Sequence, residues 1–253
     1  MNAQSQARPA ATVILLRRTE PNGFEVFLTR RPDDMPFLGG MYCYPGGAVT
    51  KDDVAPRMIE RSSGLTPAEA RRIVGAYLSP QAALGFWIAG IREVFEEIGV
   101  LFALHESGGR FPGSRACASR LGEKRAALLG KSLSFLDLLK SEELCCDLAS
   151  LAYFSHWQTP AQVSVRFDTR FFIAVLPHDQ MPLQTSYEVA HSLWLSPERA
   201  MQLHERGGLP MIFPTFASLR ALADFETLES VLKEFGAGRT SSHPAVSITA
   251  KNG

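Results

Sequence analysis

Three glutamates, Glu93, Glu96 and Glu97, lie within five residues of the stretch AGIREVFEEIG, residues 89–99. Like charges three or four positions apart on a helix repel each other by a few tenths of a kcal/mol per pair. Three carboxylates on one side of a helix also supply the converging oxygen ligands that a hard divalent cation requires, at roughly 2.0–2.4 Å. A bound cation such as Mg²⁺ would offset the repulsion, whereas a merely solvated acidic face is the alternative interpretation.

The helix that must position these glutamates is predicted over residues 81–98. At 100° per residue, seven apolar side chains fall on one face and the glutamates on the opposite side; the apolar set is Leu84, Trp87, Ile88, Ile91, Val94, Phe95 and Ile98. Gly99 is typical of a helix C-terminus. Arg92 precedes Glu96 by four positions and is placed to hold that carboxylate in an i,i+4 ion pair.

The rest of the chain predicts an α+β or mixed-sheet sandwich, because strands lie outside with helices between them and without strict alternation. A hairpin is expected around the turn signal EPNG, and a strand that ends in a Gly-Gly bend follows it. Thr66 is expected to cap a helix that has Pro67 at its first position. The segments are strands at 11–18, 24–31, 151–160, 166–177 and 188–196, and helices at 56–62, 66–78, 214–225 and 227–236, with a basic loop running into a helix at 107–125.

Composition limits the classes of function. The 253 residues contain 26 basic and 26 acidic side chains, which gives no reason to expect binding to nucleic acid or to an anionic membrane. No run of 18 apolar residues predicts a membrane span. The four cysteines form no CxxC pair, so free thiols in a reducing cytoplasm are expected, and the final residues ITAKNG are not a peroxisomal address.

The stretch Arg92–Val100 resembles the second half of the signature of the Nudix hydrolases, Arg-Glu-aliphatic-x-Glu-Glu-x-Gly-aliphatic, and matches it completely. The first half resembles Pro45-Gly46-Gly47, and six positions after Gly47 stands Asp53 where the family has glutamate. An insertion of 31 residues, 54–84, then separates Asp53 from Arg92. Such a break fits an inactive protein, or a branch in which the loop has grown while its ends still meet. Long surface insertions cost little free energy, and this favours a branch with a longer loop over an inactive protein.

Further fragments are similar to one branch with such an insertion, the peroxisomal-type coenzyme A diphosphatases. The matching fragments, in shared order over about residues 12–200, are VFLTRR, FLGGMYCYPGG, REVFEEIGVL, HWQTP, RFDTRFF and EVAHSLWLSPERA. This resemblance implies a single Nudix domain over 8–236, an α/β/α sandwich whose mixed sheet lies between helices. It carries the helical insertion and C-terminal helices, and residues 237–253 are expected to be a loose tail.

The resemblance also implies roles for the acidic residues. Glu93, Glu96 and Glu97 would hold Mg²⁺ or Mn²⁺, with the Gly47 carbonyl as a further ligand, and Arg92 would support them. The general base is left open between Glu93 and Glu188. The metal would screen the charge of the diphosphate, lower the pKa of a bound water and orient it for attack on phosphorus.

The phosphates of a substrate such as coenzyme A require cations. The candidate substrate-binding residues are Arg30, Arg31, Gly46, Gly47 and Arg166. Because side chains alternate along a strand, at most one of Arg30 and Arg31 should reach the site. Arg166 and Arg170 flank Asp168, and guanidinium groups suit phosphate. His156 and Trp157 are expected more in the core than in the pocket.

Three functions remain open at this point. The first is hydrolysis of coenzyme A or acyl-coenzyme A to 3′,5′-ADP and 4′-phosphopantetheine or its acyl form. The second is hydrolysis of ADP-ribose or another nucleoside diphosphate derivative. The third is a non-catalytic Nudix-like sensor, which the substitution at Asp53 and the long insertion would favour. The sequence allows a homodimer and predicts a small-molecule partner.

Overall fold

The structure is a computed structural model that describes residues 7–109, 111 and 115–236. A mixed seven-stranded sheet runs through its centre in the order β10-β2-β1-β9-β8, with β3 paired to β2 and β4 paired to β1. Strands β1 and β9 are parallel, and the other pairs are antiparallel. The strands are β1 (Arg8–Thr19), β2 (Gly23–Arg30), β3 (Tyr42–Cys43), β4 (Gly46–Ala48), β8 (Ala152–Gln158), β9 (Phe167–Val175) and β10 (His191–Leu195). The predicted hairpin and later strands are therefore confirmed.

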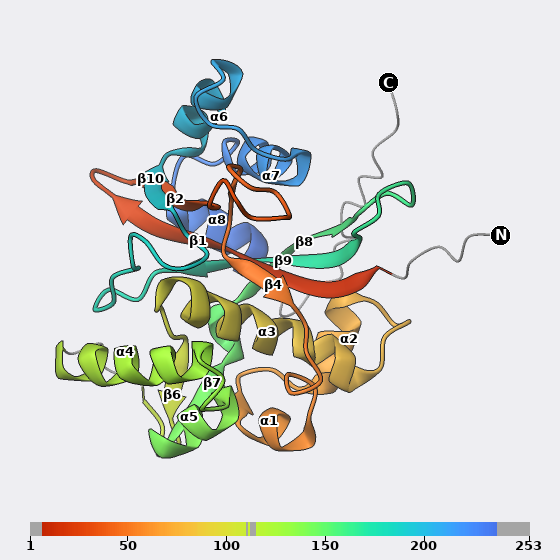
Figure 1. Cartoon of the computed structure of the whole chain (residues 1–253), viewed down its shortest axis with the longest axis vertical. Coiled ribbons are helices and arrows are strands. Elements are labelled where there is room, and N and C mark those ends of the chain that lie inside the picture. Colours follow the sequence, from red (N-terminus) through yellow and green to blue (C-terminus); the bar gives the residue numbers. More distant parts are fainter. Residues whose placement is uncertain (1–6, 110, 112–114, 237–253) are drawn as a thin grey trace.

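Helices cover both faces of this sheet (Figure 1). Successive side chains of β1 point to opposite faces of the sheet and so belong to two apolar clusters. Val13 and Leu15 pack toward α3 (Pro80–Ile98), whereas Ile14 and Leu16 face the other side. That other side is covered by α6 (Pro197–Glu205), α7 (Phe213–Leu222) and α8 (Leu228–Gly236). The predicted sandwich of a mixed sheet between helices is thus confirmed.

Helix α3 begins and ends where its sequence dictates. The Ser79 hydroxyl accepts a hydrogen bond from the Ala82 N–H and Pro80 takes the first helical position, while Gly99 ends the helix at φ +75°. The helix lies close to β1 at Gly90, where a Cβ atom would come 3.2 Å from a Val13 methyl. Glu97 is buried although it lies on the acidic side, which excludes the interpretation of that side as a simply solvated face.

A third layer, which includes part of the insertion, lies on the side of α3 away from the central sheet (Figure 1). Residues 54–79 form α1 (Pro56–Glu60), β5 (Ser62–Ser63) and α2 (Pro67–Val74). The predicted Thr66 cap is confirmed as a reciprocal capping box with Glu69, although α2 ends at Val74 rather than running to residue 78. Strand β5 pairs with β7 (Leu144–Asp147), which pairs with β6 (Ala103–His105).

The remaining elements of this layer are α4 (Arg115–Leu129), α5 (Phe135–Ser141) and the 3₁₀ turn η1 (Leu148–Ser150). Figure 1 shows α1, α4 and α5 together on the side of α3 away from the central sheet. The small sheet and α5 were not predicted. The expected loose tail, 237–253, lies outside the described residues. Among the helices that are described, none combines the length and apolar character needed to cross a membrane.

Candidate active site

The register of the central sheet brings the glycine bend against α3. Strand β4 pairs with β1 so that Gly46 lies opposite Thr12 and Gly47 opposite Ala11. A Cβ atom on Gly47 would lie 2.5 Å from the carboxyl carbon of Glu93, so any side chain at position 47 would require the Glu93 carboxylate to move. The Gly46 backbone N–H donates a hydrogen bond to the Glu97 carboxylate. The bend and two of the three glutamates therefore form one compact group.

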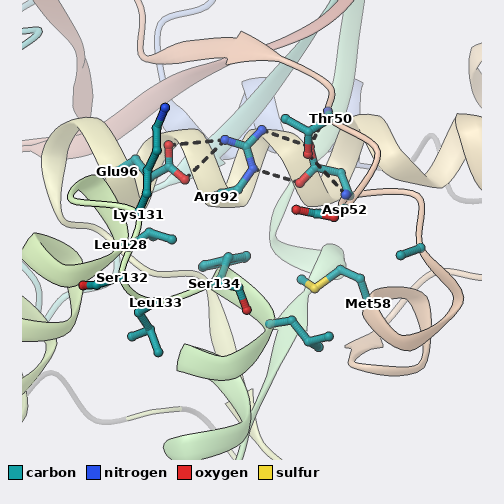
Figure 2. A pocket seen from close by; sticks show the side chains of 14 residues that line it. Thr50, Asp52, Met58, Arg92, Glu96, Leu128, Lys131, Ser132, Leu133 and Ser134 are labelled. Carbon is teal, nitrogen blue, oxygen red and sulfur yellow. Dashed lines mark hydrogen bonds and ion pairs between the residues drawn. The ribbon is translucent and has the colours of Figure 1, made fainter.

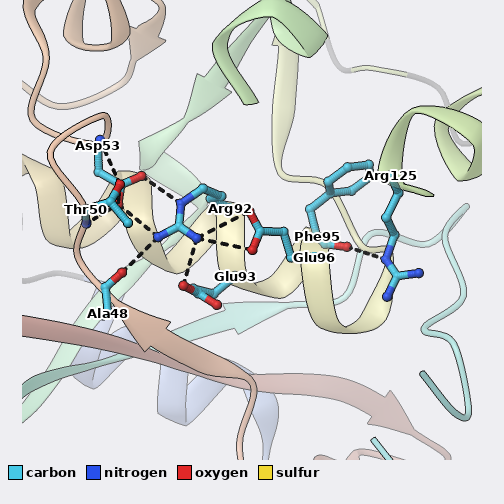
Figure 3. A network of polar contacts seen from close by, with 8 residues as sticks. All are labelled: Ala48, Thr50, Asp53, Arg92, Glu93, Phe95, Glu96 and Arg125. Carbon is cyan, nitrogen blue, oxygen red and sulfur yellow. Dashed lines mark hydrogen bonds and ion pairs between the residues drawn. The ribbon is translucent and has the colours of Figure 1, made fainter. Parts of the chain in front are cut away.

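Arg92 connects the two ends of the insertion. Its Nε and Nη2 donate to the two carboxylate oxygens of Asp53 at 2.8 and 2.9 Å, across 39 positions of the sequence. Its Nη1 donates to Glu93 at 2.7 Å and to Glu96 at 3.3 Å, and Nη2 also donates to the Ala48 carbonyl at 2.9 Å (Figure 3). The ends of the insertion thus meet, and Asp53 contacts the arginine of the second half of the motif.

Burial makes the three carboxylates reluctant to ionise. It raises the pKa of Glu93 to about 7 and the pKa of Glu96 above its usual value, in both cases against the opposing charge of Arg92. For Glu97 burial again dominates, and the charges of Glu93 and Glu188 raise the pKa further. Burial works against the charge of Arg92, yet its bonds to Asp53 and the neighbouring carboxylates raise its pKa. A cation would relieve this crowding of negative charge.

The donor set fits a hard divalent cation in its chemistry. Three carboxylates lie on adjoining turns of one helix, and Gly47 leaves room beside Glu93. In the arrangement described, Glu93 and Glu96 are turned toward Arg92, and no three acidic, histidine or cysteine side chains in the described part of the chain converge as a ligand group. The residues that could hold the ion are Glu93, Glu96 and Glu97.

The two adjacent arginines at the end of β2 separate as the alternation of a strand requires. Arg30 forms an ion pair with Asp33 at 2.5 Å. Arg31 donates from Nε to the Phe37 carbonyl at 3.1 Å, and its charge lowers the pKa of Glu97. Arg31 is therefore the member of the pair that lies near the acidic group.

The loop between β9 and β10 carries Glu188 toward the same group. The loop is fastened to the end of α3 by the Leu183 N–H, which donates to the Ile98 carbonyl at 2.9 Å. The side chain of Gln180 also exchanges two hydrogen bonds with the backbone of Leu101. Glu188 itself is exposed, and its charge raises the pKa of both Glu96 and Glu97.

Arg166 lies elsewhere, at the start of β9. Its Nε donates to the Thr159 carbonyl at 3.3 Å, a bond within the β8–β9 connection. The neighbouring Arg170 is fully buried: it forms an ion pair with Asp168 at 2.6 Å and stacks on Phe86 with the guanidinium carbon 4.9 Å from the ring centre. His156 bonds to the same Asp168. The RFDTRFF stretch thus contributes a buried ionic cluster.

A pocket of about 460 Å³ beside Glu96 was not predicted from the sequence (Figure 2). One wall comes from the insertion at Met58, the other from α4 and the turn after it, at Leu128 and Lys131, and α3 contributes Arg92 and Glu96. No local pattern identifies such a pocket, because its walls come from segments that lie far apart along the chain.

The chain is similar to known proteins in both its sequence and its structure. A family model described as the NUDT19 Nudix domain matches residues 3–222. The chain is 27% identical to the acyl-coenzyme A diphosphatase NUDT19 of Gallus gallus and 26% identical to that of Homo sapiens, over 89% and 94% of this chain and 70% of each relative. A crystal structure of a Nudix hydrolase from Alicyclobacillus acidocaldarius superposes with a TM-score of 0.72 at 29% identity, covering 91% of this chain and 97% of that one.

Proposed function

Because the chain belongs to the NUDT19 Nudix domain family, whose members are hydrolases that act on a diphosphate bond, we propose that it hydrolyses coenzyme A or acyl-coenzyme A. The products would be 3′,5′-ADP and 4′-phosphopantetheine or its acyl form. The observation that carries the proposal is similarity, over most of the chain, to two proteins named as acyl-coenzyme A diphosphatases. The glutamates of α3 beside the Gly46–Gly47 bend support it.

Each residue of the group has a task in such a hydrolysis. A bound Mg²⁺ or Mn²⁺ supplies charge neutralisation of the diphosphate and a more acidic water. Glu93, Glu96 and Glu97, with the Gly47 carbonyl, would hold that ion, and Arg92 would keep two of the carboxylates oriented through its bonds to them. Glu93 or Glu188 would accept the proton of the attacking water as the new P–O bond forms and the bridging P–O bond breaks.

Substrate phosphates need donors that face the same space. Arg31, whose charge already acts on Glu97, is the better placed of the two β2 arginines. The backbone of Gly46 and Gly47 allows a phosphate to approach without a side chain in the way. Arg30 is held by Asp33, and Arg166 is bonded within the β8–β9 connection, so both are weaker candidates for phosphate binding.

A substrate panel tests the proposal. The protein would be incubated with Mg²⁺ and coenzyme A, an acyl-coenzyme A, NADH or ADP-ribose, and the products separated by chromatography. Release of 3′,5′-ADP from only the first two is expected, and Glu97→Gln should reduce turnover at least about a hundredfold, about 3 kcal/mol of barrier, while melting normally. Turnover of ADP-ribose alone would overturn the coenzyme A assignment. Ligand binding without turnover in either form would indicate a sensor.

Three finer assignments belong to the same proposal. The physiological ion is proposed to be Mg²⁺ or Mn²⁺. To distinguish the two, the metal would be removed and the activity measured while each ion is titrated back. Location in the cytoplasm rests on the free cysteines and is tested by microscopy of the tagged protein. A homodimer would be detected by light scattering after size-exclusion chromatography. We expect no binding to nucleic acid or membranes.

A further inference from the structure

The 460 Å³ pocket beside Glu96 lies between the insertion and the α4–α5 turn (Figure 2). Thr50, Asp52 and Met58 line it on one side, and Leu128, Lys131 and Leu133 on the other. Its floor is the face of α3 that carries Arg92 and Glu96. The volume is within the range of about 300–1,000 Å³ for small-molecule sites. The pocket therefore opens directly beside one of the predicted metal ligands and has room for part of a substrate.

The charge of the lining disfavours a group that carries several phosphates. Asp52, Asp53 and Glu96 contribute three carboxylates, and the Arg92 guanidinium is already paired with Asp53 and Glu96. Lys131 is the remaining cation of the lining, and it forms no ion pair with a carboxylate among the described residues. A group with two phosphates, such as 3′,5′-ADP, would thus face more negative than positive charge.

The rest of the lining suits a neutral chain with apolar and amide groups. The side chains of Met58, Leu128 and Leu133 give apolar walls, and the hydroxyl oxygens of Thr50 and Ser132 can accept hydrogen bonds from amide N–H groups. The pantetheine arm of coenzyme A has this character, since it is uncharged and combines methyl groups with two amides. Lys131, on the same lining as Glu96, suits the phosphate to which that arm is attached.

We propose that this pocket binds the pantetheine arm of the substrate, with the wall of the insertion acting as a specificity element. The inference rests on the proposed function, because it names which half of the same substrate lies on the insertion side of α3. The adenosine half would then extend away from this pocket. The bonds between Asp53 and Arg92 join the two halves of the motif across the insertion, and Met58, five residues after Asp53, lies in the pocket wall.

The test is a pair of substitutions at adjacent positions of α4. Leu128 is half-buried and lines the pocket, whereas Leu129 is exposed and does not. Leu128→Trp should fill the pocket, and Leu129→Trp is the matched control. Binding of 4′-phosphopantetheine and of 3′,5′-ADP, each with Mg²⁺, would be measured by isothermal titration calorimetry on the wild type and both variants. Ala55→Phe, from the opposite wall, repeats the test should Leu128→Trp fail to fold.

We expect Leu128→Trp to weaken 4′-phosphopantetheine binding at least about tenfold and to change 3′,5′-ADP binding by less than about twofold, with Leu129→Trp like the wild type. Asp52→Asn removes a carboxylate of the lining, so it should not weaken 4′-phosphopantetheine binding, and it should leave 3′,5′-ADP binding unchanged because the nucleotide half lies outside the pocket. Weaker 3′,5′-ADP binding in Leu128→Trp, or tighter 3′,5′-ADP binding in Asp52→Asn, would place the nucleotide half in the pocket and overturn the inference. So would no binding of 4′-phosphopantetheine by the wild type at millimolar concentration, or unchanged binding in both wall variants.

These outcomes are separable from those of the proposed function. Hydrolysis of coenzyme A with unaltered 4′-phosphopantetheine binding in the wall variants would reject the pocket assignment alone. Failure to hydrolyse coenzyme A, with 4′-phosphopantetheine binding that Leu128→Trp abolishes, would reject the proposed reaction while retaining the pocket assignment.

Discussion

Removing the charge of Asp53 should destabilise the protein by about 3 kcal/mol. The side chains of Asp53 and Arg92 are 2% and 9% exposed, and they form a two-bond ion pair. Deleting one partner of a buried pair typically costs about 3–5 kcal/mol, because the other charge remains buried. Glu93 and Glu96 still offer counter-charges to Arg92 in Asp53→Asn, so we expect the lower end of that range.

Urea denaturation followed by tryptophan fluorescence would measure this loss. The matched control is Asp52→Asn, an exposed neighbour, which should remain within about 0.5 kcal/mol of the wild type. Asp53→Asn should also lower turnover, because Arg92 would no longer be anchored while it orients the two glutamates. A change in the free energy of unfolding of less than about 1 kcal/mol would refute the idea that this pair joins the two halves of the motif.

Three further predictions concern charge and backbone. Burial raises the pKa of Glu93 from 4.5 to about 7. Between these pH values the metal-free folded protein therefore keeps a proton that the unfolded chain has lost. The free energy of unfolding of the metal-free protein should fall by about 3 kcal/mol as the pH rises from 4 to 8. Thermal melts over this pH range, in a chelator and in excess Mg²⁺, would check this. The decrease of stability with pH should be smaller in Mg²⁺, because the bound ion favours the ionised carboxylate. Asp168→Asn should cost at least about 3 kcal/mol, because the fully buried Arg170 loses its carboxylate partner. Denaturation would measure this loss, with Asp34→Asn, at an exposed position, as the control. Lys131 has φ +58°, so Lys131→Gly should stabilise the fold by about 0.5–1 kcal/mol in thermal melts while it weakens coenzyme A binding.

The sequence was informative where a local pattern carries the physics. The apolar period of α3 and its terminal Gly99 predicted the helix. Counting six positions from Gly47 identified Asp53 as the position of the signature glutamate, but its pairing with Arg92 was not predicted. The alternation rule separated Arg30 from Arg31. In each case, neighbours within a few residues or a fixed spacing determine the outcome.

Other features depend on contacts between distant segments, which no single-sequence pattern encodes. The pocket draws on residues near 50–58, 92–96 and 128–136, and the small sheet contains strands of only two to four residues, too short for a detectable period. Asp168 and Arg170 share a buried cluster because Arg170 stacks on Phe86 of α3. The groups that surround the buried Glu97 carboxylate also come from distant segments, namely the Gly46 backbone, Arg31 and Glu188.

Direct measurement of Mn²⁺ binding by electron paramagnetic resonance tests most sharply whether the α3 glutamates form the metal site. The signal of free Mn²⁺ would be titrated with wild-type protein and with Glu97→Gln, after both are shown to melt alike. Stoichiometric binding by the wild type, weakened at least about tenfold in Glu97→Gln, is the predicted result. Equal affinity in the two proteins, or no binding by the wild type, would contradict it.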